Sequence, residues 1–285
     1  MEYNMSIDEF KEMISREEYT PKHYDYVDYW EFEQLVKIGD IANLFEELAD
    51  RLGRIPTQQE YIAEGVERSK AYFTNPAKMK NGGRWFPIKK DAKGKVTRWH
   101  HFKWDKLLEM AVTQRMARSY PSHLVEYSTI LTLLSKFKEY RVGANDYLDG
   151  IMGVDLVVAS EKHNKVVYVH VTSASDYSDH WLKKKEKRSG TVYDKDGNKH
   201  HYKRNFKRGH VHLAFSKFEE TDSTEFVNGL PIIKESHLQS VLETAFVLAP
   251  YTDSYKKMEQ LVDLHKWLKT NGIDANGLGK VFFKV

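Results

Sequence analysis

The most regular run of apolar positions in this chain lies at residues 153–175, GVDLVVASEKHNKVVYVHVTSAS. Residues 154–159 are apolar apart from Asp155, residues 166–172 are rich in β-branched side chains, and the four residues 161–164 between them are polar. Near-continuous apolar runs of this length are typical of strands that are covered on both faces. The pattern predicts two neighbouring strands joined by a short polar turn.

Asp155 is the one acid inside the first of these strands. A buried polar group without a hydrogen bond costs roughly 1–3 kcal/mol, and a buried charge costs more. Asp155 therefore needs a partner. A metal ion or a basic group would serve, and so would the backbone amide of a neighbouring loop, so that both a functional and a structural role are open.

The first part of the chain shows the apolar spacing of amphipathic helices. Helices are predicted at residues 6–18, 27–38 and 38–52. After Gly53, the pair Thr57 and Glu60 has the spacing of a capping box, which predicts a further helix that ends near Gly65. Two helices around a glycine turn have the outline of a helix-turn-helix, and any pair of packed helices shares that outline.

Residues 81–104 alternate between apolar and polar positions around a turn at residues 91–94, which predicts a β-hairpin. Aromatic side chains that alternate with basic ones can stack on bases and hold phosphates. Arg84, Trp85 and Trp99 are the predicted nucleic-acid contacts. The alternative is a hairpin whose aromatic residues form its core side, with exposed lysines opposite.

The second half of the chain mixes helical and strand patterns. Helices are predicted at residues 104–119, 123–140, 175–188, 236–243 and 255–270, a second hairpin at 191–206, and strands at 209–216, 244–249 and the C-terminal VFFKV. Glu126 lies at the edge of the apolar side of its helix, where its carboxylate either reaches solvent or points into a cleft. We predict a mainly helical N-terminal region with a hairpin (residues 1–118) and an α/β domain with a mixed sheet (residues 119–285).

Composition narrows the classes of protein. The 285 residues include no Cys, which excludes disulfides and thiolate metal sites and is compatible with a reducing compartment. The N-terminus carries acids rather than an apolar stretch, and no run approaches the roughly 18 apolar residues of a membrane helix. A cytoplasmic protein with no membrane contact is expected.

The net charge of +3 hides an asymmetry along the chain. Residues 1–60 hold 15 acids and six basic residues, whereas residues 183–208 hold 11 basic residues and three acids. The basic stretch is what a polyanion partner requires, although such stretches are commonly solvated faces. Nucleic acid, DNA rather than RNA, is the predicted partner, through Lys183, Lys185, Lys203, Arg204, Lys207 and Arg208.

A helix with Glu126, a strand with Asp155 and a next strand with His170 and Thr172 resemble the core of the PD-(D/E)XK nuclease superfamily over residues 122–215. The resemblance implies a nuclease, a hydrolase in which Glu126 and Asp155 bind Mg²⁺ or Mn²⁺. It also implies catalytic roles at Glu126, Asp155, His170 and Thr172. This sequence departs from the family at His170, where an acid is expected, and at Thr172, where a Lys is expected.

The two departures change the expected chemistry. A neutral imidazole is a poor ligand for Mg²⁺ and favours softer metals. Some members of the superfamily carry the Lys on a neighbouring helix, and Lys184 or one of its neighbours would fill that role here. With such a substitute for the missing Lys, the function that the resemblance implies is nucleic-acid binding with metal-dependent phosphodiester cleavage.

Two other interpretations remain. Val169–Thr172, written VHVT, has the form of one motif of the 2H phosphoesterases, and the best second copy is VHLA at residues 211–214, where the hydroxyl is lost. Those enzymes need two histidines, one as base and one as acid. The other alternative is a non-catalytic interaction or inhibitor protein, with a degenerate nuclease-like core and an acidic N-terminal region that covers a basic surface on a protein partner.

Overall fold

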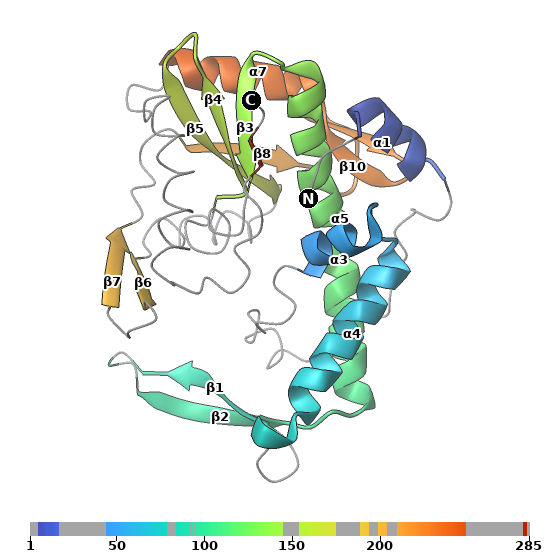
Figure 1. Cartoon of the computed structure of the whole chain (residues 1–285), viewed down its shortest axis with the longest axis vertical. Coiled ribbons are helices and arrows are strands. Elements are labelled where there is room, and N and C mark those ends of the chain that lie inside the picture. The colour runs from blue at the N-terminus through green and yellow to red at the C-terminus, as the bar shows by residue number, and fades with distance from the viewer. Residues whose placement is uncertain are drawn as a thin grey trace. The chain divides into compact units, whose positions relative to one another are not determined.

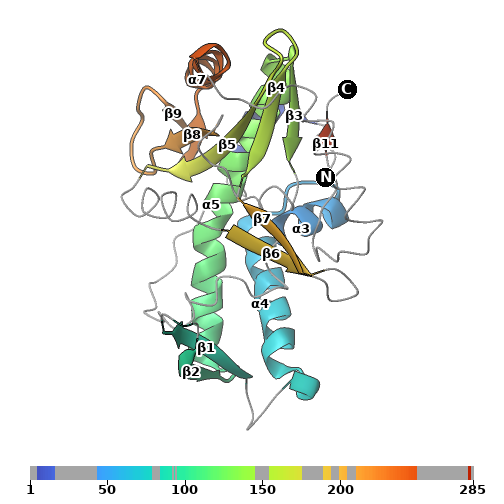
Figure 2. The same cartoon turned by 90° about the vertical axis from the view of Figure 1, so that its left-hand side faces the viewer.

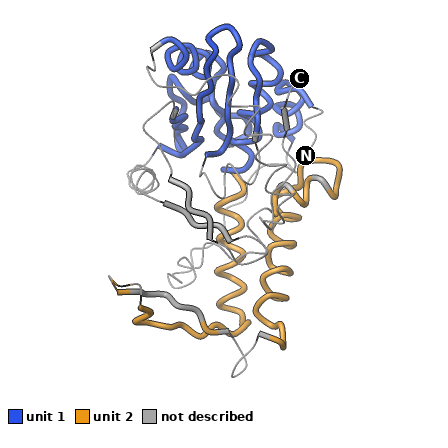
Figure 3. Tube along the Cα trace, turned by 60° about the vertical axis from the view of Figure 1, so that its left-hand side comes forward, with its two compact units in different colours: residues 1–17, 122–285 blue, residues 18–121 orange. Residues whose placement is uncertain are grey.

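The computed structural model describes residues 5–16, 44–78, 84–91, 93, 95–144, 154–174, 189–193, 199–203, 210–248 and 282–283. The chain divides into two compact units (Figure 3). Unit 1 comprises Met1–Glu17 and Ser122–Val285, and unit 2 comprises Glu18–Pro121. The division at residue 121 falls close to the predicted boundary after residue 118, but the first helix belongs to the same unit as the C-terminal region.

Unit 1 is built around a mixed sheet, and the fold is of the α/β class that the sequence predicts. Among the described residues the strand order is β11-β3-β4-β5-β8, in which β5 and β8 are parallel and the other neighbours are antiparallel (Figure 1). The strands are β3 (Tyr140–Ala144), β4 (Leu156–Ser160), β5 (Lys165–Ser173), β8 (His210–Phe215) and β11 (Phe282–Phe283).

The predicted strand pair is confirmed as β4 and β5, which are direct neighbours. Every residue of β4 is buried, as an apolar run covered on both faces requires. The strands predicted at residues 209–216 and at the C-terminus are confirmed as β8 and β11. The second hairpin is confirmed as β6 (Ser189–Tyr193) paired with β7 (Lys199–Lys203). The helices predicted at residues 27–38, 175–188 and 255–270 lie outside the described residues.

Helix α7 (Glu235–Leu248) packs against β5 and β8 (Figure 2). The ring of Phe246 lies 5.1 Å from that of Tyr140 and 5.7 Å from that of His163, and its carbonyl accepts a hydrogen bond from Lys165 Nζ at 2.7 Å. The prediction of a strand at residues 244–249 is therefore wrong for residues 244–248, which belong to α7. A short apolar run does not distinguish strand from helix, and here Phe246 continues the buried face of Leu238 and Leu242.

Helix α1 (Ile7–Ile14) begins at the capping box of Ser6 and Glu9 and packs within unit 1. Phe10 is completely buried, with its ring 5.8 Å from that of Tyr127. The amide of Ile7 donates to Ser135 Oγ at 3.2 Å, and Asn228 Nδ2 donates to the carbonyl of Ile14 at 3.0 Å. These contacts explain why α1 belongs to unit 1 although it precedes unit 2 in the sequence.

Asn228 belongs to a hairpin that the sequence analysis missed, β9 (Thr224–Val227) with β10 (Leu230–Ile233). Asn228 and Gly229 have φ angles of 48° and 79°, as the central pair of a tight hairpin turn requires. The Asn-Gly pair between apolar runs was the available signal.

Unit 2 contains α3 (Leu44–Leu52), α4 (Gln58–Thr74), a 3₁₀ turn (Pro76–Lys78), the hairpin β1 (Arg84–Lys90) with β2 (Val96–Phe102), and the first half of α5 (Lys106–Lys136). Its core includes the rings of Phe45, Tyr61 and Tyr120, whose centroids lie 5.8–6.1 Å apart. The capping box of Thr57 and Glu60 and the hairpin are confirmed.

Helix α4 does not end near Gly65, as the sequence analysis predicted, but continues to Thr74. Gly65 is a point of close packing rather than a helix stop. A Cβ atom at this position would lie 2.5 Å from Met116 Sδ on α5 and 3.2 Å from Leu44 Cδ2 on α3. The missing side chain therefore serves the packing of three helices.

Helix α5 is continuous through Pro121, where two separate helices were predicted. Proline has no amide hydrogen, so the carbonyl of Ala117 loses its usual donor within the helix. The buried side chain of Gln58 supplies another donor, with Nε2 at 3.4 Å from that carbonyl. The sequence gives no sign of this compensation because Gln58 lies on another helix.

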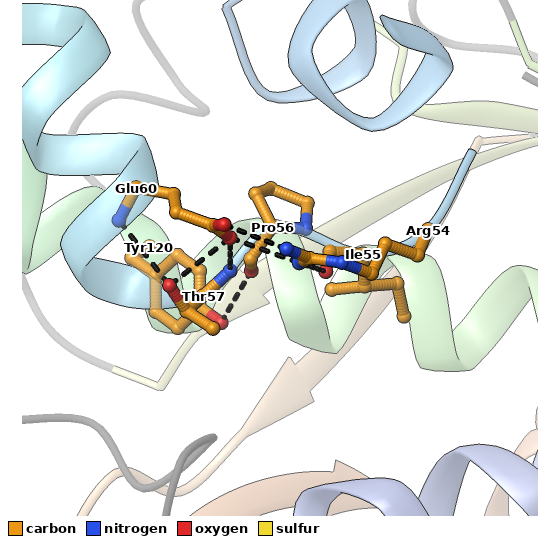
Figure 4. A network of polar contacts seen from close by, with 6 residues as sticks. All are labelled: Arg54, Ile55, Pro56, Thr57, Glu60 and Tyr120. Atoms are coloured by element: carbon orange, nitrogen blue, oxygen red, sulfur yellow. Dashed lines mark hydrogen bonds and ion pairs between the residues drawn. The ribbon is translucent and has the colours of Figure 1, made fainter. Parts of the chain in front are cut away.

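The N-terminus of α4 is held by a network around Glu60 (Figure 4). The Glu60 carboxylate accepts the amide of Thr57 at 2.8 Å and pairs with Arg54 at 2.6 Å, while the Tyr120 hydroxyl donates to the carbonyl of Pro56 at 2.9 Å. The hydrogen bond from Arg54 and those from Thr57 lower the pKa of Glu60 to about 2. Glu60 therefore stays ionised well below neutral pH.

We expect Glu60→Gln to destabilise the protein by about 1 kcal/mol at pH 7, since Gln keeps the capping geometry and removes the charge. The Glu60 side chain is 37% exposed, so solvent reduces the effect below the full value of the pKa shift. The pKa is lower in the folded state, so this contribution is present above about pH 4.5 and is lost as the pH falls toward 2. Urea unfolding at pH 7 and pH 3 tests this expectation, and an equal difference at both values would contradict it.

No helix within the described ranges is long and apolar enough to cross a membrane.

Candidate functional site

Asp155 lies immediately before β4, because this strand begins at Leu156 and not at Val154 as predicted. A backbone amide of β5 is one partner of its side chain. The carboxylate Oδ2 accepts the amide of Val171 at 2.6 Å, and the amide of Asp155 donates to the carbonyl of Val169 at 3.1 Å. The side chain is half-buried. The expectation that this acid requires a partner is therefore met by a short charge-assisted hydrogen bond. Val171 lies between His170 and Thr172, so the carboxylate is bonded next to both positions that the nuclease resemblance singles out.

His170 is 1% exposed and stacks on a second histidine. Its ring lies 4.9 Å from that of His212, with the planes inclined by 14°. The two residues are in register on the parallel strands β5 and β8. His212 is exposed, so the pair consists of a buried imidazole covered in part by an exposed one.

The face of the sheet that carries His170 follows from the strand register. Tyr140 pairs with Ser160, and Ser160 pairs with Lys165, so Tyr140 shares its face with the odd-numbered residues of β5. His170 and Thr172 are therefore on the opposite face from Tyr140, whose ring contacts Phe246 of α7. Thr172 is half-buried and in register with Ala214.

The two copies of the possible 2H motif lie side by side in this register. Each residue of VHVT is paired with the corresponding residue of VHLA, from Val169 with Val211 to Thr172 with Ala214. A histidine that exchanges protons with a substrate must reach it. The nearly complete burial of His170 does not favour that role, and stacking is the interaction that the pair makes.

Glu126 lies in the part of α5 that belongs to unit 1, and its side chain is half-buried. The next residue, Tyr127, is buried and packs against the ring of Phe10. Its burial raises the pKa of its hydroxyl to about 12. Over the described part of the chain, no group of three or more His, Asp or Glu side chains is arranged to hold a metal ion. A site made by Glu126, Asp155 and a main-chain carbonyl stays a prediction.

Most of the predicted basic contacts fall outside the described residues. These are Lys183, Lys184, Lys185, Arg204, Lys207 and Arg208. Lys203 is the last residue of β7, where its backbone pairs with Ser189. The role of this basic stretch in nucleic-acid binding stays a prediction.

The hairpin β1–β2 divides its aromatic residues between its two faces. Phe102 is completely buried, with its ring 5.8 Å from that of Phe73 on α4. Trp85 and Trp99 are 47% and 52% exposed. The alternative in which the aromatic residues form the core side therefore holds for Phe102 but not for the two exposed indoles. Contact of these indoles with nucleic acid stays a prediction. Arg84 forms the first pair of the hairpin, opposite Phe102.

Sequence reasoning missed two ring contacts at these sites. One is the stack of His170 on His212. The similarity of the two four-residue motifs was visible in the sequence, but the parallel register of their strands was not. The other is the stack of Trp85 on His101, with ring centroids 4.6 Å apart. Alternation along the hairpin was the signal for the second contact, since it puts opposite residues on one face.

No protein-family model, curated protein or solved structure matches this chain.

Proposed function

We propose that this protein binds nucleic acid and cleaves phosphodiester bonds with the help of a divalent metal ion. The observation that carries the proposal is the bond of the Asp155 carboxylate to the amide of Val171, at 2.6 Å on the neighbouring strand. Asp155, which matches the strand Asp of the family, is thus bonded to the residue between His170 and Thr172, the two positions that follow it in the family's pattern.

The donor set of the proposed site suits Mg²⁺ or Mn²⁺, which prefer oxygen ligands. Asp155 and Glu126 would each supply a carboxylate, and a main-chain carbonyl near His170 would supply a further oxygen. A carboxylate has about four lone-pair positions, so Asp155 can accept the Val171 amide and also coordinate a cation. The metal would lower the pKa of a bound water and polarise the phosphate. Lys184 or one of its neighbours would offset developing charge where the family has a Lys and this chain has Thr172.

A second candidate is a non-catalytic nucleic-acid or protein-binding role. The specific observation in its favour is that the bond to Val171 already gives Asp155 a structural role. The acidic N-terminal region gives this candidate less support. Four of its acids bind groups within their own unit: Asp8 pairs with Lys136, Glu9 accepts the amide of Ser6 in the capping box of α1, Glu47 pairs with Arg68, and Glu60 pairs with Arg54.

Nucleic-acid binding is expected to weaken steeply with salt, because each neutralised phosphate releases counterions. Replacing Lys203, Arg204, Lys207 and Arg208 by Ala should reduce the slope of log affinity against log salt concentration by up to about 3 on a single strand and about 3.6 on a duplex. A control variant loses the same charge from exposed lysines elsewhere, Lys70, Lys106, Lys138 and Lys162. Equal slopes for the two variants would show that the basic stretch is a solvated face.

A further inference from the structure

The register of the hairpin brings its exposed rings to one face. Trp85 pairs with His101, and Trp99 pairs with Pro87, two positions along β1 from Trp85. Residues directly opposite, and residues two apart on one strand, point to the same side of a sheet. Trp85, Trp99 and His101 therefore form one surface, which we call the indole face.

The side of the hairpin opposite the indole face contributes to the core of unit 2. There the Phe102 ring lies 4.3 Å from that of His100 and 5.8 Å from that of Phe73. Trp85 and Trp99 each keep about half of their surface exposed, and the plane of Trp85 lies at 19° to that of His101. Large, flat rings are thus held at the surface of a regular element.

The hairpin that carries the indole face is strongly basic. Residues 84–103 contain seven Lys or Arg and one acid. That acid, Asp91, is engaged by the backbone of the turn, where Oδ1 accepts the amides of Lys93 and Lys95 at 2.9 Å each. The side chains of Lys93, Lys95 and Lys103 are exposed. A partner that suits this surface carries negative charge and flat apolar faces.

We propose that the indole face is a stacking site for the unpaired bases of a single-stranded nucleic acid. This inference rests on the proposed nucleic-acid binding and specifies its substrate class. Every base offers a π-face to an indole, and the phosphates between bases suit the flanking lysines. In a duplex the base faces are stacked on each other, so a duplex reaches the lysines but not the indoles.

The test measures the affinity of the full-length protein for a fluorescent oligonucleotide, first single-stranded and then as a blunt duplex of the same sequence. Trp85→Ala and Trp99→Ala should each weaken single-strand binding about 5- to 150-fold and leave duplex binding unchanged. Trp99→Tyr should retain most of the affinity, because a smaller aromatic ring still stacks. Phe218→Ala is the matched control, since Phe218 is an aromatic residue 93% exposed outside the hairpin.

The outcomes separate this inference from the proposed function. Single-strand binding that is unchanged in both Trp→Ala variants would overturn the inference and leave nucleic-acid binding intact. Absence of binding to either oligonucleotide at low salt would overturn both. Exposed indoles with lysines are also typical of membrane surfaces, so vesicles of phosphatidylcholine with phosphatidylserine form a further arm. Trp-dependent binding to these vesicles without single-strand binding would assign the indole face to a lipid surface and overturn the inference.

Discussion

Asp155→Asn is expected to reduce the rate of metal-dependent cleavage about a thousandfold. A factor of this size corresponds to the several kcal/mol of transition-state stabilisation that a bound metal ion supplies in such reactions. Asn has nearly the shape of Asp but lacks the charge that neutralises a cation. The side-chain oxygen of Asn can still accept the amide of Val171, so the connection between the start of β4 and β5 is retained. Cleavage of labelled oligonucleotides in Mn²⁺ gives the measurement, and the same reaction in chelator gives its background.

The stability of the same variant separates catalysis from structure. Exchanging a charge-assisted hydrogen bond for a neutral one should cost about 1 kcal/mol of unfolding free energy. Asp155→Ala removes the acceptor and should cost about 2–3 kcal/mol, because the amide of Val171 then has no bond from this side chain. Mn²⁺ should raise the melting temperature of the wild type alone, since on this proposal only the folded state with both carboxylates would bind the ion. An equal response to Mn²⁺ in the wild type and in Asp155→Asn would leave Asp155 with a structural role.

Phe10→Ala is expected to lower the free energy of unfolding by about 3–5 kcal/mol. Phe10 is completely buried and packs on Tyr127, so its removal leaves a cavity between α1 and α5. The effect tests the observation that the N-terminal helix belongs to unit 1. Urea unfolding gives the measurement, with Glu12→Ala as the control on the exposed side of α1. A loss no larger than that of Glu12→Ala, expected to lie within about 0.5 kcal/mol, would contradict the packing of α1.

The parts of the fold that the sequence predicted are those with strong local signals. The Val-rich runs of β4 and β5, the turn of the hairpin β1–β2 and the capping box of Thr57 and Glu60 each depend on neighbouring residues. The hairpin β9–β10 carried an equally local signal in Asn228 and Gly229 and could have been predicted.

The errors arose where a contact distant in sequence outweighs a local preference. Pro121 suggests a break, but the side chain of Gln58 reaches the carbonyl that the proline leaves without a donor. Gly65 suggests a helix end, but the space it leaves is filled by Met116. Neither compensation is visible in the residues that flank the apparent break.

Only those features of the candidate site that depend on neighbouring residues could be predicted from the sequence. An acid next to an apolar strand was expected to need a partner, and the short turn predicted that β4 and β5 are neighbours. The identity of the partner, the amide of Val171, depends on the backbone path at the start of β4 and could not be predicted. The stack of His170 on His212 depends on the register of two parallel strands separated by more than 30 residues, which no local pattern fixes.

The most direct test of the proposed function is a cleavage assay that compares wild type with Asp155→Asn on the same single-stranded oligonucleotide in Mn²⁺. We predict that the wild type forms shorter products, that chelator abolishes them, and that Asp155→Asn forms about a thousandth as much. Products in equal amounts from both proteins, or none from the wild type on single- or double-stranded substrates, would contradict the proposal that Asp155 serves a metal-dependent nuclease.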